Sequence, residues 1–303
     1  MQKERFKSKI GGQALIEGIA MRGPEQTCLA VRLPSGEIHT EMHNTPKNPV
    51  RNIPLVRGAV AMILSLKEGY KFLMKAADYA YPDENDESKM DEKAKKKKKN
   101  ENSWLGVVSG VLGGMLSIAL FMVVPTVITG LLAKVLPIDG FKSVIEGALK
   151  IVVFILYLFL VTRMKEIHRV FEYHGAEHKT IACYEHGEEM TVENVRKYSR
   201  FHPRCGTSFL FIVIIISILI FTFIPWGSTL GRVGLKLLLL PLVMGISYEI
   251  IQYAGSHENL LCRFLSAPGL WVQRLTAFEP DDSEIEVAIA SLIPVIPQGG
   301  EQL

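Results

Sequence analysis

The residues best suited to chemistry lie between positions 173 and 180, where the sequence reads YHGAEHKT. In a helix, His174 and His178 would lie one turn apart on the same face, with Glu177 beside them. Two neutral imidazoles at this spacing can bind a divalent cation such as zinc, and a neighbouring carboxylate can accept a proton from a reacting water molecule. The spacing therefore predicts a metal site in which His174 and His178 are ligands and Glu177 is the base.

The order H-x-x-E-H is a signature of the inverzincin metallopeptidases, which supports this interpretation. Five residues alone fit equally well an exposed helix turn with solvated side chains, so the third ligand matters. Glu185 is one candidate, because a continued helix would return it to nearly the direction of His178. Glu249 is the other candidate, because a carboxylate in an apolar segment is costly and usually has a partner. A structural contact of Glu249 with Arg204 or a nearby tyrosine is the alternative.

A second polar motif, HPRCGTSF at residues 202–209, precedes an apolar segment. Arg204 and the small residues after Cys205 resemble the amino-terminal end of a helix that binds an anion. We therefore expect Arg204 to orient an anionic substrate. His202 and Cys205 could add a nitrogen and a sulfur ligand, but a buried thiol at the membrane boundary is the favoured interpretation of Cys205.

The composition indicates a membrane protein. Hydrophobic residues make up 48% of the 303-residue chain and charged residues 21%, with a mean hydropathy of +0.21. Four apolar segments are near the length of about 20 residues that crosses a hydrocarbon core. They lie at residues 105–136, 144–164, 209–224 and 233–253. We therefore expect a mainly α-helical protein with four transmembrane helices in contact with membrane lipid.

The basic residues predict the orientation of these helices. They gather before the first apolar segment, at Lys95 to Lys99, in the loop at residues 165–208, and after the fourth segment. By the positive-inside rule, both termini and the loop at 165–208 lie in the cytoplasm, as in a multi-pass protein of the cell membrane. The lysine run fits this topology signal better than nucleic-acid binding. All the polar motifs then share one side of the membrane.

The chain divides into four parts. Residues 1–80 predict a cytoplasmic β-hairpin, with strands at 27–33 and 37–43, followed by an amphipathic helix at 55–79. Residues 81–103 are polar, acidic and then basic, which is typical of a disordered linker. Residues 104–255 hold the four spans and the His-rich cytoplasmic loop. Residues 256–303 form a cytoplasmic segment with helices expected from Pro268 and at 284–292.

Four sequence blocks in this order resemble the YqhQ-like family of bacterial integral membrane proteins. The blocks are GGQALIEG at 11–18, YHGAEHKT at 173–180, HPRCGTSF at 202–209 and PGLWVQRLT at 268–276. The resemblance covers nearly the whole chain apart from the charged linker. It implies an integral membrane protein of a group described as metal-dependent enzymes, and it implies no catalytic residues of its own.

The sequence thus predicts a membrane-embedded, metal-dependent hydrolase at the cytoplasmic face. His174 and His178 would bind zinc, Glu249 or Glu185 would complete the site, Glu177 would activate water, and Arg204 would orient an anionic substrate. The alternative is a non-catalytic membrane scaffold or regulator with a structural His cluster. Metal content separates the two hypotheses.

Overall fold

The chain forms two compact units, each built from separate stretches of sequence. The computed structural model describes residues 6–50, 52–82, 104, 106, 108–256 and 260–297. The first unit comprises Met1–Pro82, Leu158–Val213 and Pro241–Leu303, and the second comprises Asp83–Tyr157 and Ile214–Leu240. Most of the predicted linker, residues 83–103, lies outside the described residues.

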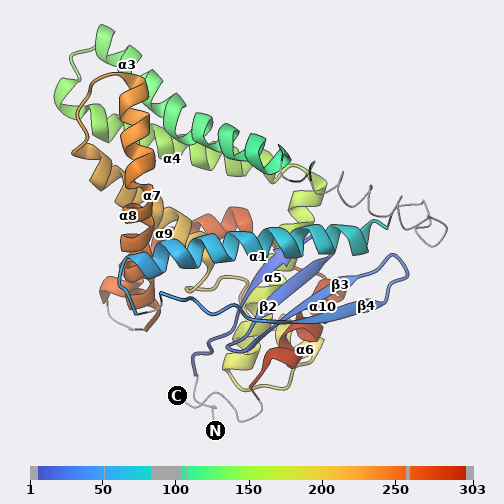
Figure 1. Cartoon of the computed structure of the whole chain (residues 1–303). Helices are drawn as coiled ribbons and strands as arrows, with labels where there is room; N and C mark the ends of the chain where they lie inside the picture. Colours follow the sequence, from blue (N-terminus) through green and yellow to red (C-terminus); the bar gives the residue numbers. More distant parts are fainter. Residues whose placement is uncertain are drawn as a thin grey trace. The chain divides into compact units, whose positions relative to one another are not determined.

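The first unit contains a four-stranded antiparallel sheet (Figure 1). Its strands lie side by side in chain order: β1 (Gly11–Leu15), β2 (Gly18–Arg22), β3 (Gln26–Arg32) and β4 (Ile38–Asn44). Strands β3 and β4 confirm the predicted hairpin, and β1 and β2 add a second hairpin that the sequence analysis did not predict. Gly18 permits its close packing, because a Cβ there would lie 2.5 Å from the carbonyl oxygen of Ala30.

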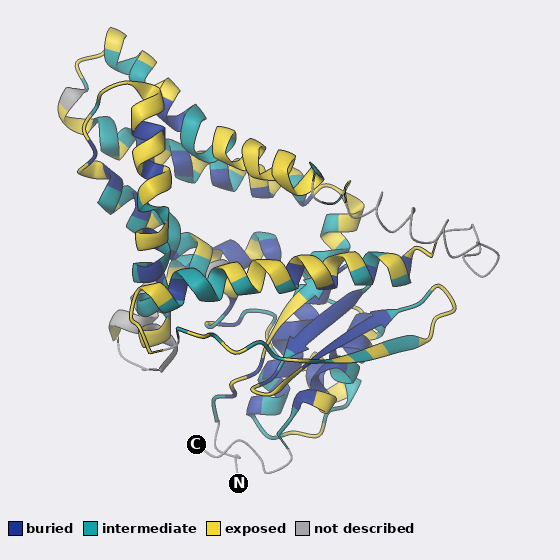
Figure 2. Cartoon of the chain, in the orientation of Figure 1, coloured by how far each residue is buried: buried dark blue, intermediate teal, exposed yellow. Residues whose placement is uncertain are grey.

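Both faces of the central strands are buried (Figure 2). The helix α1 (Val56–Ala80) covers one face, and the helices α5 (Lys165–Glu185) and α10 (Asp282–Leu292) cover the other. Side chains alternate between the two faces, as strand geometry requires. Ile19, Met21, Cys28 and Ala30 pack with α5 and α10, whereas Ala20, Leu29 and Val31 pack with α1.

Short helices in the first unit begin at recognisable caps. Helix α6 (Val192–Arg196) follows the cap Thr191, whose hydroxyl accepts a hydrogen bond from the N–H of Asn194. Helix α10 begins with a capping box formed by Asp281 and Glu284.

Helix α9 (Leu260–Thr276) does not start at Pro268 as predicted. That proline lies inside the helix, where its missing N–H removes one hydrogen bond without ending it.

Three described helices are long and apolar enough to cross a membrane. They span Val108–Val135, Lys142–Val161 and Thr229–Tyr253, with 28, 20 and 25 residues. The first includes a π-helical turn, Ala119–Val123, followed by α3 (Val124–Val135); the second is α4 (Lys142–Val161), and the third belongs to α8 (Thr229–Ser256). The π turn lies just before Pro125, a residue that cannot donate a helical hydrogen bond.

The third expected span, residues 209–224, is a shorter apolar helix. It is α7 (Gly206–Thr222), with 17 residues, which corresponds to a length of about 26 Å. The helix ends three residues before Pro225. The structure therefore supports three candidate spans among the described residues, rather than four.

Candidate metal centre

Helix α5 presents the two histidines of the central motif as expected. His174 Nδ1 donates to the carbonyl oxygen of Thr276, and His178 Nδ1 donates to that of Arg200, each at 2.5 Å. The ring centroids of the two histidines lie 4.3 Å apart. With Nδ1–H engaged by a carbonyl, each imidazole has Nε2 as the nitrogen that can accept a proton or bind a cation. Burial, together with the charge of His174, lowers the pKa of His178, which favours the neutral ring.

The third group at this centre is Cys205, just before α7. Its Sγ lies 3.1 Å from His174 Nε2, and one ligand atom from each of His174, His178 and Cys205 lies within 4.8 Å of the others. This thiol is buried, as predicted, but it lies against the histidines rather than in an inert apolar site. In the described part of the chain, these three residues form the one group whose spacing suits a metal ion.

Glu177 is held by the sheet. Its Oε1 accepts a hydrogen bond of 2.9 Å from the backbone N–H of Gly12 in β1. The side chain is buried, and burial raises its pKa against the opposing effects of His174 and the Gly12 N–H. Gly12 is required for this contact, because a Cβ there would lie 2.8 Å from Glu177 Cδ. A buried carboxylate one turn from His174 suits a group that exchanges protons.

Glu185 and Arg204, both predicted at the site, bind each other and the amino-terminal segment. Glu185 Oε1 accepts from Arg204 Nη2 and from the N–H and hydroxyl of Ser8 at 2.8 and 3.0 Å. Arg204 Nη1 donates to the carbonyl oxygen of Ser8 at 2.6 Å. Burial would raise the pKa of Glu185, but the adjacent His202 imidazole, the Arg204 guanidinium and the Ser8 N–H outweigh it and lower the pKa to about 2. The geometry favours a positioning role for both residues.

Glu249, the other candidate ligand, lies elsewhere in the first unit. Its carboxylate accepts from Arg57 Nε and Nη2 at 2.8 and 2.5 Å, and from the N–H of Leu55 at 3.2 Å. The pair joins the start of α1 to α8. Gly245 on the same helix packs against Leu55, where an added Cβ would lie 2.4 Å from the carbonyl oxygen. The structure therefore does not bring Glu249 to the histidines.

The carboxyl-terminal end of α9 completes the surroundings of the histidines. Gln273 donates to the carbonyl oxygen of His202 and accepts from its N–H, both at 2.8 Å. A Cβ on Gly175 would lie 1.9 Å from the carbonyl oxygen of Phe278. The backbone N–H of Phe278 in turn donates to the carbonyl oxygen of Phe171 at 2.9 Å. This close approach places Thr276 against His174. The sequence analysis gave Gly175 and Gln273 no role, although both lie in the quoted family motifs.

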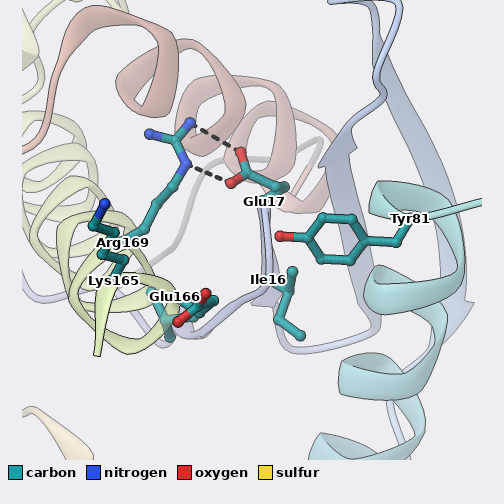
Figure 3. A pocket seen from close by; sticks show the side chains of 7 residues that line it. Ile16, Glu17, Tyr81, Lys165, Glu166 and Arg169 are labelled. Carbon is teal, nitrogen blue, oxygen red and sulfur yellow. Dashed lines mark hydrogen bonds and ion pairs between the residues drawn. The ribbon is translucent and has the colours of Figure 1, made fainter. Parts of the chain in front are cut away.

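A pocket of about 220 Å³ lies beside the first turns of α5 (Figure 3). Glu17, between β1 and β2, accepts two hydrogen bonds from Arg169, and its second oxygen accepts another from the hydroxyl of Tyr173 at 3.1 Å. Glu17 has a φ of 50°, a left-handed conformation that is uncommon for a residue with a side chain. Glu17 follows strand β1, and Arg169 and Tyr173 belong to α5. These hydrogen bonds therefore connect the sheet to the helix that carries the histidines.

The described residues thus form a mainly α-helical protein with a four-stranded sheet, three candidate membrane spans and a His-His-Cys group. Residues 53–298 match the family described as "Protein of unknown function (DUF1385)", and the chain belongs to this family. It is similar to "Uncharacterized protein YqhQ" of Bacillus subtilis (strain 168), with 34% identity over 297 residues, covering 96% of this chain and 93% of that protein. No solved structure matches the chain.

Proposed function

We propose that this protein is a membrane-embedded hydrolase that uses a divalent metal ion, zinc by preference, held by His174, His178 and Cys205. The observation that carries the proposal is the orientation of the two imidazoles. Both Nδ1–H groups donate to backbone carbonyls, and the three ligand atoms lie within 4.8 Å of one another. Metal-binding histidines are commonly oriented by such a hydrogen bond from the opposite ring nitrogen.

The donor set fits zinc. Zinc accepts imidazole nitrogen and thiolate sulfur together, and three protein ligands leave the fourth tetrahedral position open, which is typical of catalytic sites. A structural zinc site usually has four protein ligands. The three-residue group therefore favours catalysis over the alternative of a structural His cluster in a scaffold. When bound, such an ion supplies a Lewis acid for an attacking water or a substrate carbonyl.

The protein's own residues would then have separate roles in catalysis, positioning and substrate binding. Glu177 accepts and returns a proton, and the Gly12 N–H holds one of its oxygens in place. Glu185, Arg204 and Ser8 fasten the amino-terminal segment beside α5. Arg204 retains partial exposure, with 23% of its side chain accessible, so an anionic substrate could contact it at that edge. We further propose that the chain is a multi-pass cell-membrane protein with both termini in the cytoplasm.

The experiment that tests this function measures metal per chain by mass spectrometry in the purified full-length protein. We expect about one zinc per wild-type chain. His174→Ala, His178→Ala and Cys205→Ala should each lose most of it, while Glu177→Gln should keep it. Wild type and Glu177→Gln are then compared on panels of ester, amide and phosphoester substrates.

Metal bound by the wild type, together with turnover that Glu177→Gln abolishes, would support a hydrolase. Stoichiometric metal without turnover of any panel member by the wild type would favour the scaffold. Absence of metal from the wild type would rule out the metal-dependent hydrolase and favour the scaffold without a metal site. The three ligand variants also serve as controls for one another, because each should give the same loss.

A further inference from the structure

The second unit buries four charged side chains inside its apolar helices. Glu146 and Lys150 belong to α4, and Arg232 and Lys236 belong to α8. None of the four residues is more than 7% exposed. Ionised groups inside candidate membrane spans are costly, so they normally pair with one another or mark a binding site. The metal centre proposed above uses none of them.

Glu146 forms ion pairs with two of the three cations. Its Oε2 accepts from Arg232 Nη2 at 2.8 Å, and its Oε1 accepts from Lys236 Nζ and from the hydroxyl of Thr126 at 2.5 Å. Lys236 Nζ also donates to Thr126 Oγ1 at 2.7 Å. One carboxylate therefore faces two positive charges, which leaves an excess of one at this point.

Lys150 adds a third cation. It lies one helical turn from Glu146, yet its Nζ donates to Ser217 Oγ at 3.0 Å and lies 4.9 Å from the ring centroid of Phe221. Lys236 Nζ lies 5.8 Å from the same centroid. No carboxylate pairs with Lys150 among the residues that the structure describes. Three cations against one carboxylate give the cluster a net charge of two positive, and Lys150 is the cation without an acidic partner among the described residues.

Arg232 places the cluster near a membrane interface. Its guanidinium lies 4.0 Å from the ring of Trp226, and Trp226 Nε1 donates to Ser143 Oγ at 3.4 Å. Tryptophans gather at membrane interfaces, close to the lipid head groups. Glu146 and Lys150 follow Lys142, the first residue of α4, by four and eight positions, or about 6 and 12 Å along the helix. The cluster thus extends inward from the level of the head groups.

We propose that this cluster binds a phosphate-bearing anion. Phosphate carries the negative charge needed to balance the net positive charge of the cluster, and guanidinium and ammonium groups are its usual protein partners. Arg232 also retains a buried Nε–H with no hydrogen-bond partner among the described residues, which is a free donor for such a group. The anion is either the phosphate of a lipid head group or free phosphate, since both present the same oxygens.

The test uses the full-length protein, purified in a non-ionic detergent and washed free of lipid. Its thermal unfolding is followed while phosphatidylglycerol, phosphatidylcholine or inorganic phosphate is added. We expect phosphatidylglycerol to raise the unfolding temperature and phosphatidylcholine to have no comparable effect. Inorganic phosphate acting alone would support the anion site and identify free phosphate as the occupant.

Two substitutions should change the response in opposite directions. Lys150→Gln removes a positive charge and should weaken the response about tenfold in anion concentration, as expected for one charged hydrogen bond. Glu146→Gln removes the negative charge and should strengthen the response. Lys134→Gln, an exposed lysine of α3, is the matched control and should behave as the wild type.

The proposal would be overturned if the unfolding temperature of Lys150→Gln responded to the anion as that of the wild type does. It would also be overturned if phosphatidylglycerol and phosphatidylcholine raised the unfolding temperature equally and inorganic phosphate had no effect. If the variants do not fold, the phosphate bound by the washed wild-type protein at equilibrium with added phosphatidylglycerol or inorganic phosphate decides. About one phosphate per chain at saturation with either anion supports the site, and no saturable binding of either overturns it. Metal content is measured in parallel, so that failure here is distinguished from failure of the metal centre.

Discussion

The backbone N–H of Gly12 donates to Glu177 Oε1 at 2.9 Å, across 165 residues of sequence. This contact joins the first strand of the sheet to the helix that carries both histidines. It fixes one carboxylate oxygen of the proposed base while the rest of the side chain stays buried beside His174. The sheet is therefore part of the proposed site rather than a separate attachment.

Gly12→Ala should disturb the base and leave the metal ligands in place. The new Cβ would lie 2.8 Å from Glu177 Cδ and 2.9 Å from Met21 Sδ, so the carboxylate must move. We expect a loss of stability of about 1–3 kcal/mol, typical of overpacking, with metal content retained. Unfolding in denaturant and metal analysis check this. Gly11→Ala is the matched control, because nothing lies within 4 Å of its Cβ; equal effects of the two variants would contradict the prediction.

Gly175→Ala should instead release the metal. A Cβ at this position would lie 1.9 Å from the Phe278 carbonyl oxygen, which forces the segment after α9 away from α5. The hydrogen bond from His174 Nδ1 to Thr276 would then be lost, and metal affinity should fall about 10–100-fold, as for other partners that orient a ligand. Competition with a zinc chelator measures the affinity. Gly113→Ala, where a Cβ has open space, should bind as the wild type does.

Glu185→Gln and Glu249→Gln should both keep the metal, because each carboxylate is engaged away from the three ligand atoms. Glu185→Gln leaves the Arg204 guanidinium without its anion and should destabilise the protein by about 3 kcal/mol. The stability that Glu185 contributes is present above its ordinary pKa near 4.5 and is lost as the pH falls through about 2. Denaturant unfolding at pH 7 and pH 3 checks the size and direction. Loss of metal in either variant would restore that glutamate as a ligand.

Glu284 should make stability fall as the pH rises. Burial raises its pKa from an ordinary value near 4.5 to about 8, and the charges of Asp281 and Glu172 act in the same direction. Because the pKa is raised in the folded state, the contribution of protonated Glu284 to the free energy of unfolding is complete below pH 4.5 and is lost as the pH rises through 8. Glu284→Gln still offers an acceptor to the Asp281 N–H, so it should flatten this part of the stability curve. Glu286→Gln, half exposed on the same helix, should leave it unchanged.

Reporter fusions should show whether α7 crosses the membrane. A reporter inserted near Glu189 and another fused after Leu303 should both behave as cytoplasmic. A reporter in the segment between α7 and α8, at residues 225–228, should behave as external if α7 spans. A cytoplasmic signal there would leave α7 outside the set of spans, and an external signal at Glu189 would contradict the proposed orientation of the site.

Local sequence signals predicted the elements whose ends carry caps or turns. The hairpin of β3 and β4 and the helices α1 and α10 were confirmed, because turn residues and periodicity act over a few positions. The hairpin of β1 and β2 was missed for the opposite reason. Its glycines lower strand propensity, and it is buried by α1, α5 and α10, which lie far away in the sequence.

The site was predicted in part for similar reasons. Helical spacing was enough to bring His174 and His178 together, whereas Cys205 depends on the loop before α7. Glu249 was chosen because it lacked a visible partner within the spans. Its partner, Arg57, lies 192 residues away, and no local rule could find it. The same holds for Lys236, which pairs with Glu146, 90 residues away in the sequence.

The first unit is assembled from three stretches of sequence, and this determines when it can form during synthesis. Cys28 in β3 packs beside Ala290 in α10, so this face of the sheet is covered only in part, by α5, until α10 has left the ribosome. The intervening apolar helices emerge first, and the site closes only after them. A chain that stops before α10 would have both histidines and Cys205 but lack the cover of its core, which makes it a natural target for proteolysis.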